Sequence, residues 1–129
     1  MRVLFLGDIV GNPGRHAIEQ NLKDQIVKND IAFVIANGEN AAKEGVGITK
    51  SISESLFNSG VDVITTGNHV WDQKNIMNYI DKENRLLRPK NLFEPAPGRG
   101  FEIYISNENL KVGVLNLMGN VFMKKCDDV

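Results

Sequence analysis

Three short apolar runs, each followed at once by a glycine and polar side chains, constrain the fold of this chain most strongly. The runs are Val3 to Leu6, Ile31 to Ala36 and Val61 to Ile64. Near-continuous apolar runs of this length are typical of parallel strands that are buried on both faces. The first run ends at a glycine and fits a central strand. An open α/β sheet binds its ligands in the crevice at the carboxyl ends of such strands.

Helical patterns separate the three runs. Gly11 to Gly14 has the composition of a turn, and the segments that follow place apolar side chains on one helical face. We expect helices at 15–27, burying Ile18, Leu22 and Ile26; from a Thr49 cap to Asn58, burying Ile52, Leu56 and Phe57; and at 72–80, burying Ile76, Met77 and Ile80. This alternation of strands and helices predicts an α/β fold with a parallel sheet and right-handed crossovers.

The character of the chain changes after Arg88. The mixed-charge stretch Lys82 to Lys90 predicts a solvated connection, and the prolines and glycines that follow it predict a loop. Residues 101–106 and 111–117 then predict a β-hairpin. The apolar segment Val121 to Met123 is followed by only six residues. Since a finished domain would cover such a segment with another element, we expect the chain to be incomplete.

Composition narrows the classes of protein. Hydrophobic residues make up 42% and charged residues 24% of the chain, as in soluble globular domains. The formal net charge of −1 gives no electrostatic footprint for nucleic acid. No apolar stretch is long enough to span a bilayer, and a strand that begins next to Met1 leaves no room for a signal peptide. Together with the single cysteine, Cys126, these features predict a cytoplasmic protein.

The polar clusters after the three runs carry the candidate chemistry. They are Gly7-Asp8, Gly38-Glu39-Asn40 and Gly67-Asn68-His69. Because all three follow parallel strands, their oxygen and nitrogen donors should meet at one edge of the sheet, which indicates a metal site. Each cluster also has a purely structural interpretation: Asp8 and Asn40 as turn-forming side chains, and His69 as a structural histidine.

Other kinds of site have weaker support. The loop from Gly7 to Gly14 lacks the G-x-G-x-x-G spacing, and Pro13 removes an amide that a phosphate could use. No P-loop and no G-x-S-x-G nucleophile motif occurs. Cys126 has no recognisable base partner, and His16 falls in the first turns of a helix, where it is expected at the surface.

The motif series resembles that of calcineurin-like metallophosphoesterases, and within them the YmdB-like family of bacterial phosphodiesterases. The stretches that carry the resemblance cover essentially the whole chain. They are Met1 to Gly11, Ala36 to Ala42, Thr66 to Asp72 and Leu115 to Gly119. The resemblance implies that residues 1–129 are the N-terminal part of a single metallophosphoesterase domain, with an α/β sheet, flanking helices and a hairpin.

The resemblance also implies a function. It points to a hydrolase of cyclic nucleotides such as 2′,3′-cyclic AMP with two metal ions, iron or manganese. By position, Asp8 and Asn40 would bind the first metal, Glu39 would bridge both, Asn68 would bind the second, and His69 would donate a proton. Asp72 either orients His69 or caps the following helix.

Two departures from the wider pattern matter. Many relatives in the superfamily have a histidine at the position where this chain, like the YmdB-like branch, has Val10. Family members are also much longer, and their second half adds several metal-binding histidines, whereas this sequence has only His16 and His69. Three interpretations follow: an enzyme completed by a C-terminal segment, an inactive fragment that pairs with itself through residues 121–123, or a small-molecule binding module. An oxygen-rich ligand set without further imidazoles favours magnesium or manganese.

Overall fold

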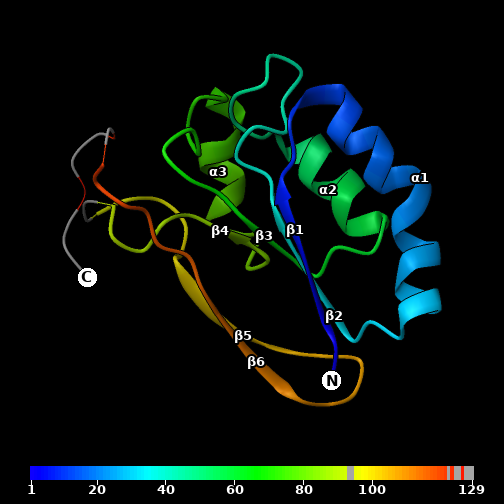
Figure 1. The fold of residues 1–129 in the computed structure, drawn as a ribbon. Helices are drawn as coiled ribbons and strands as arrows, with labels where there is room; N and C mark the ends of the chain where they lie inside the picture. The colour runs from blue at the N-terminus through cyan, green and yellow to red at the C-terminus, as the bar shows by residue number, and fades with distance from the viewer. Residues whose placement is uncertain (93–94, 122, 124–125, 127–129) are drawn as a thin grey trace.

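A computed structural model describes residues 1–92, 95–121, 123 and 126. A four-stranded parallel sheet carries helices on one face and a two-stranded hairpin on the other (Figure 1). The elements in chain order are β1 Val3–Asp8, α1 Gly11–Asn29, β2 Phe33–Asn37, α2 Lys50–Asn58, β3 Val63–Thr65, the 3-10 helix η1 Lys74–Ile76, α3 Met77–Ile80, β4 Leu86–Leu87, β5 Phe101–Ile105 and β6 Lys111–Leu115. The predicted α/β class is confirmed.

The sheet runs in the order β1-β2-β3-β4 with every neighbouring pair parallel. Register places alternate residues of each strand on opposite faces. The helix side holds the larger core, in which Ala36, Ile64 and Leu86 are fully buried. The hairpin side holds a smaller cluster built on Phe33 and Val63. The central strands are therefore covered on both faces.

The first strand does not occupy the predicted place. β1 was expected to be central and buried, but it forms one edge of the sheet, with Val3 and Phe5 exposed by 45% and 60%. The expectation is wrong because an apolar run shows only that a strand is suited to burial. Its position in the sheet, central or edge, depends on which other strands pair with it.

The first two helices follow the predicted pattern with one correction. α1 begins at Gly11, so the segment predicted as a turn is the first helical turn. Pro13 is compatible with this, because the first turn of a helix has no carbonyl partners for its N–H groups. α2 starts where expected, with the Thr49 hydroxyl accepting a hydrogen bond from the Ile52 N–H at 3.3 Å.

The region after β3 differs most from the prediction. The helix expected over 72–80 is a 3-10 turn followed by the four-residue α3, and Met77 is 45% exposed while Ile80 is buried. The predicted solvated connection is not solvated throughout, because it contains β4, in which Leu86 and Leu87 are fully buried. Arg88, the next residue of the same connection, is also buried. A two-residue strand has no periodicity to detect, so only pairing with β3 defines it.

The predicted hairpin is confirmed, although its strands end slightly earlier than expected. It packs through Val112 and Val114 against the sheet. Gly100 lies so close to the backbone of Lys90 that any side chain there would collide with it. Val121 is 78% exposed, whereas Phe122 lies outside the described residues. No helix in the described ranges has the length and apolar character needed to cross a bilayer.

Candidate metal centre

The three predicted loops meet at the carboxyl edge of the sheet. Asp8 is paired with Asn37 at the ends of β1 and β2, and Asn37 is paired with Thr65 at the end of β3. Backbone hydrogen bonds continue this alignment into the loops: the Ile9 N–H donates to the Asn37 carbonyl at 3.0 Å, and the Gly38 N–H donates to the Thr65 carbonyl at 2.9 Å. The expected convergence of the loops is therefore present.

Asp8 and Asn40 lie in direct contact. The Asn40 side-chain amide donates to both carboxylate oxygens of Asp8, each at 3.0 Å. The backbone carbonyl of Asn40 also accepts a hydrogen bond from the Gly11 N–H at 2.9 Å, and the Arg15 side chain donates to the backbone carbonyl of Ala41. These two contacts fix the second loop to the start of α1. A cation between these side chains would need Oδ1 of Asn40 in place of its NH₂ group, since an amide nitrogen has no lone pair to offer.

Glu39 belongs to the contact between the second and third loops. Its own N–H donates to Oδ1 of Asn37 at 2.9 Å, which sets the turn, and its Oε1 accepts from the backbone N–H of His69 at 3.3 Å. The carboxylate lies flush against Gly67, where a Cβ atom would overlap both carboxylate oxygens. Gly67 is thus required here for close approach, and the third loop is shaped around the carboxylate of the second.

His69 has a carboxylate partner. Its Nδ1 lies 2.6 Å from Oδ2 of Asp72. An ionised carboxylate only accepts hydrogen bonds, so Nδ1 carries the proton and Nε2 is the atom left for a substrate. The alternative, that Asp72 caps the following helix, is wrong: η1 begins at Lys74, its N-cap is Gln73, and no side chain caps it.

The structure brings the predicted residues together in pairs. Asp8 contacts Asn40, and Glu39 contacts the third loop, whereas Asn68 has no hydrogen-bonded partner among the described residues. Within those residues, no group of three or more His, Cys, Asp or Glu side chains is arranged to hold a metal ion. The donors present fit part of a metal centre, because carboxylate and amide oxygens suit divalent cations, but they do not close one.

Asn116 was not predicted to act at this site. It follows β6, is 8% exposed, and donates through Nδ2 to the carbonyls of Thr66 at 2.8 Å and Leu87 at 3.1 Å. It thereby ties the residue before Gly67 to the hairpin. The available signal was an asparagine within the apolar stretch Leu115 to Met118, since a buried polar side chain requires partners.

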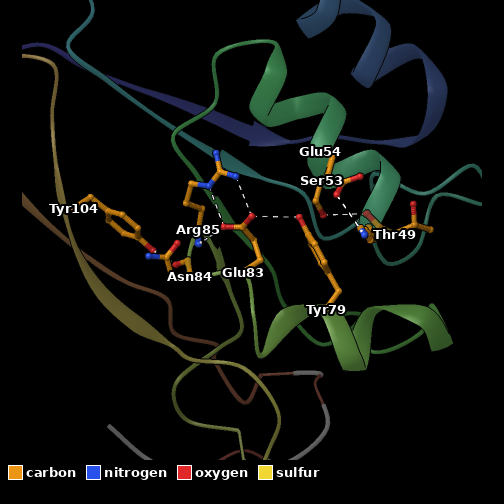
Figure 2. Close-up of polar contacts among 9 residues, drawn as sticks. Thr49, Ser53, Glu54, Tyr79, Glu83, Asn84, Arg85 and Tyr104 are labelled. Carbon is orange, nitrogen blue, oxygen red and sulfur yellow. Dashed lines mark hydrogen bonds and ion pairs between the residues drawn. The ribbon is translucent and has the colours of Figure 1, made fainter.

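The groups with shifted pKa values lie away from these loops, and two of them, Tyr79 and Glu83, belong to a network of polar contacts just before β4 (Figure 2). Arg85 donates to Glu83 at 2.9 and 3.0 Å and stacks 3.9 Å from the Phe57 ring centroid. The hydrogen bond from Arg85 holds the pKa of Glu83 below its usual value, and burial, with the nearby Glu83 charge, raises the pKa of Tyr79 to about 12. Because these residues stand at the amino end of β4, this network supports the fold and not the site.

Comparison with known proteins identifies the family. Residues 4–129 match the family described as YmdB-like protein. The chain belongs to the YmdB-like family. Its relatives include the 2′,3′-cyclic-nucleotide 2′-phosphodiesterase of Bacillus subtilis (strain 168), which is 44% identical over 128 residues. That alignment covers 99% of this chain and 48% of the relative.

Two solved structures share the YmdB-like fold. A hypothetical protein from Thermus thermophilus superimposes with a TM-score of 0.89 at 36% identity, covering 99% of this chain and 49% of the other. A phosphatase from Mycoplasma pneumoniae gives 0.82 at 35% identity, covering 91% and 42%. The chain therefore spans about half the length of the YmdB-like relatives it matches.

Proposed function

We propose that this chain supplies the N-terminal part of a two-metal phosphodiesterase that hydrolyses cyclic nucleotides such as 2′,3′-cyclic AMP. The observation that carries the proposal is that three loops meet at one edge of the sheet. Asn40 donates a hydrogen bond to the Asp8 carboxylate, and the Glu39 carboxylate packs against Gly67. The named activity of the Bacillus subtilis relative supplies the substrate class. Residues 1–129 are taken as part of one domain, and the cytoplasmic location stays a prediction.

The metal ligands proposed from this chain are Asp8, Glu39, Asn40 and Asn68, with Glu39 as the bridging carboxylate. When bound, a pair of divalent ions would activate water and neutralise charge on the phosphoryl oxygens. The described residues do not close a cluster, and we propose that further ligands come from the part of the relatives that this chain does not cover. Iron or manganese is the proposed metal of the completed site, whereas the oxygen donors of this half alone favour magnesium or manganese over iron or zinc.

His69 is proposed as the proton donor to the leaving ribose oxygen. Asp72 holds Nδ1 and so fixes the orientation of the ring, which directs Nε2 away from the carboxylate. In this step the ring acts as the imidazolium, with a proton on each nitrogen: as water adds to phosphorus and the P–O bond of the cyclic ester breaks, the ribose oxygen takes the electron pair and receives the proton from Nε2, while Nδ1 keeps its proton toward Asp72. General acid catalysis of this kind contributes roughly 10²–10⁴-fold.

The second candidate is a binding or interaction module without catalysis, either an inactive fragment that self-associates or a small-molecule binder. It is favoured by one observation: among the described residues no group of three acidic, imidazole or thiol side chains forms a metal cluster. Under this alternative the chain would bind metal weakly or not at all.

Metal content and hydrolysis of 2′,3′-cyclic AMP separate the two candidates. We expect the chain alone to bind manganese weakly without turnover. Co-expression with the part of the Bacillus subtilis relative that it does not match should give an assembly with two metal ions and turnover. In that assembly His69→Ala should keep the metal and lose at least about 10²-fold in kcat. An assembly that contains metal but is inactive with the native His69 would contradict the proposal.

A further inference from the structure

Asn116 is a buried junction between segments that lie far apart in the chain. The residue is 8% exposed, and its Nδ2 donates hydrogen bonds to the backbone carbonyls of Thr66 at 2.8 Å and Leu87 at 3.1 Å. Its backbone N–H donates to the Gly100 carbonyl at 2.9 Å, and its carbonyl accepts from the Lys90 N–H at 2.8 Å. One residue after β6 therefore binds the ends of β3 and β4 and the loop between β4 and β5.

The Thr66 carbonyl belongs to the peptide unit that opens the third loop, Gly67 to His69. A peptide unit is planar, so a hydrogen bond that fixes the carbonyl of Thr66 also fixes the N–H of Gly67 and the direction in which the chain leaves β3. Glycine accepts positive and negative φ almost equally, and this peptide could rotate at little cost if its carbonyl were free. The Asn116 amide opposes that rotation.

Thr66 is fixed a second time by its own side chain. The residue is 3% exposed, and its hydroxyl donates to the Leu87 carbonyl at 2.8 Å. The Leu87 carbonyl thus accepts from both Thr66 Oγ1 and Asn116 Nδ2. Because a buried polar group that loses its partner is costly, these three residues favour one arrangement. The start of the third loop is therefore anchored both to β4 and to the hairpin.

The far end of the third loop is held by a different contact. The His69 N–H donates to Oε1 of Glu39 at 3.3 Å, which is longer than most hydrogen bonds of this kind. Only Gly67 and Asn68 lie between the two anchored ends, Thr66 and His69. Each residue has only two soft backbone torsions, so a span this short transmits a change at Thr66 to Asn68 and His69.

We propose that Asn116 is a positioning residue for the reaction: by holding the Thr66 carbonyl it sets the orientation of the Thr66–Gly67 peptide, and with it the positions of Asn68 and His69. Asn116 acts through the third loop. The inference rests on the proposed function for the roles of Asn68 as a metal ligand and His69 as the proton donor, whereas the effect of Asn116 on the order of the loop does not depend on that function.

Asn91 offers a matched control. It is also a buried asparagine, 6% exposed, and it binds the backbone of the segment after β6: its Nδ2 donates to the Met118 carbonyl at 2.7 Å, and its Oδ1 accepts from the Met118 N–H at 3.0 Å. Asn91→Ala and Asn116→Ala therefore remove the same side chain from similar burial, but of the two only Asn116→Ala releases the Thr66 carbonyl. A purely structural role of Asn116 predicts the same result for both variants.

Nuclear magnetic resonance of the chain alone measures the order of the third loop. In Asn116→Ala we expect the His69 amide to exchange at least about 10-fold faster than in the native chain, after correction by the α2 amides, which report global unfolding. The sequence contains two histidines, so the imidazole signals of His69 should shift while those of His16, exposed on α1, stay unchanged. Asn91→Ala should leave the His69 signals and its corrected exchange rate unchanged.

Circular dichroism verifies that the variants fold. If Asn116→Ala does not fold, Asn116→Ser takes its place, because its shorter side chain cannot reach both carbonyls. The same behaviour of His69 in the variants at positions 116 and 91 would overturn the proposal.

The co-expressed assembly measures the effect on turnover. Asn116→Ala should lower kcat for 2′,3′-cyclic AMP at least about 10-fold and change KM less than about 2-fold, because proton donation by His69 belongs to the chemical step. Asn91→Ala should retain the native kcat. A native kcat in Asn116→Ala would also overturn the proposal. An assembly that is inactive with the native Asn116 would refute only the proposed function, since the order of the loop in the chain alone still decides the inference.

Discussion

The two ends of the parallel sheet differ in how completely they are covered. Around β3 and β4, side chains such as Ile64 and Leu86 are fully buried, and polar residues such as Thr66 have hydrogen-bonded partners. Around β1, by contrast, Phe5 is mostly exposed and a groove opens against α1. Both ends contain apolar strand residues, Val3 to Leu6 in β1 and Leu86 and Leu87 in β4. The difference indicates that the end with β3 and β4 contributes most of the buried apolar contacts of this chain, whereas the end with β1 leaves apolar side chains exposed.

The largest expected effect comes from the covered end. Ile64→Ala removes three methyl or methylene groups from a fully buried position between the helices and the sheet. We expect it to lower the free energy of unfolding by about 2–5 kcal/mol, because the cavity cannot collapse in a close-packed core. Urea denaturation measures this loss. A change below about 1 kcal/mol would mean that the covered end is not the source of stability.

Gly67→Ala tests whether the carboxylate of Glu39 depends on the loop that it touches. The added methyl group would displace the carboxylate, so we expect manganese affinity in the assembly to fall at least about 10-fold, equivalent to 1.4 kcal/mol. Titration calorimetry gives the value. Gly7→Ala is the matched control, since a Cβ at that nearby position meets nothing within 4 Å. Equal affinity in the two variants would detach Glu39 from metal binding.

Glu83→Gln examines the ion pair that anchors β4. We expect a loss of about 1 kcal/mol at neutral pH, because the glutamate accepts charged hydrogen bonds from a partly exposed Arg85. The pKa of Glu83 is lower in the folded chain than its usual 4.5, so this stabilisation is present above that pH and disappears as the pH falls through the folded value.

Urea denaturation at a series of pH values should therefore show the difference between Glu83→Gln and the native chain shrinking below pH 4.5. Glu44→Gln, at an exposed position, is the control for the loss of one negative charge. A difference that stays constant with pH would assign the effect to shape and not to charge.

The smallest effect is expected at the open end. Phe5→Ala in the chain alone should change the free energy of unfolding by less than about 0.5 kcal/mol, as surface substitutions usually do, because the ring already meets water. A loss of several kcal/mol in the free energy of unfolding of the isolated chain would contradict the proposed difference between the two ends of the sheet.

Those features of the site that follow from the topology of the sheet could be predicted from the sequence. Parallel strands place Asp8, Asn37 and Thr65 at one edge whatever the surrounding packing, so the meeting of the loops was predictable. Contacts decided by tertiary packing were not. The hydrogen bond between His69 and Asp72 depends on the conformation of the third loop. The strand β4 is defined only by the pairing of two of its residues with β3.

The tether from Asn116 to the Thr66 carbonyl joins positions 50 residues apart. During synthesis, the loop that carries His69 leaves the ribosome long before the side chain that fixes it. The contacts of that loop with Glu39 can form earlier, but the hydrogen bond to the Thr66 carbonyl can form only after the hairpin has emerged and docked. The last fixed contact at this edge of the sheet therefore forms late in synthesis, after all the strands of the parallel sheet have been made.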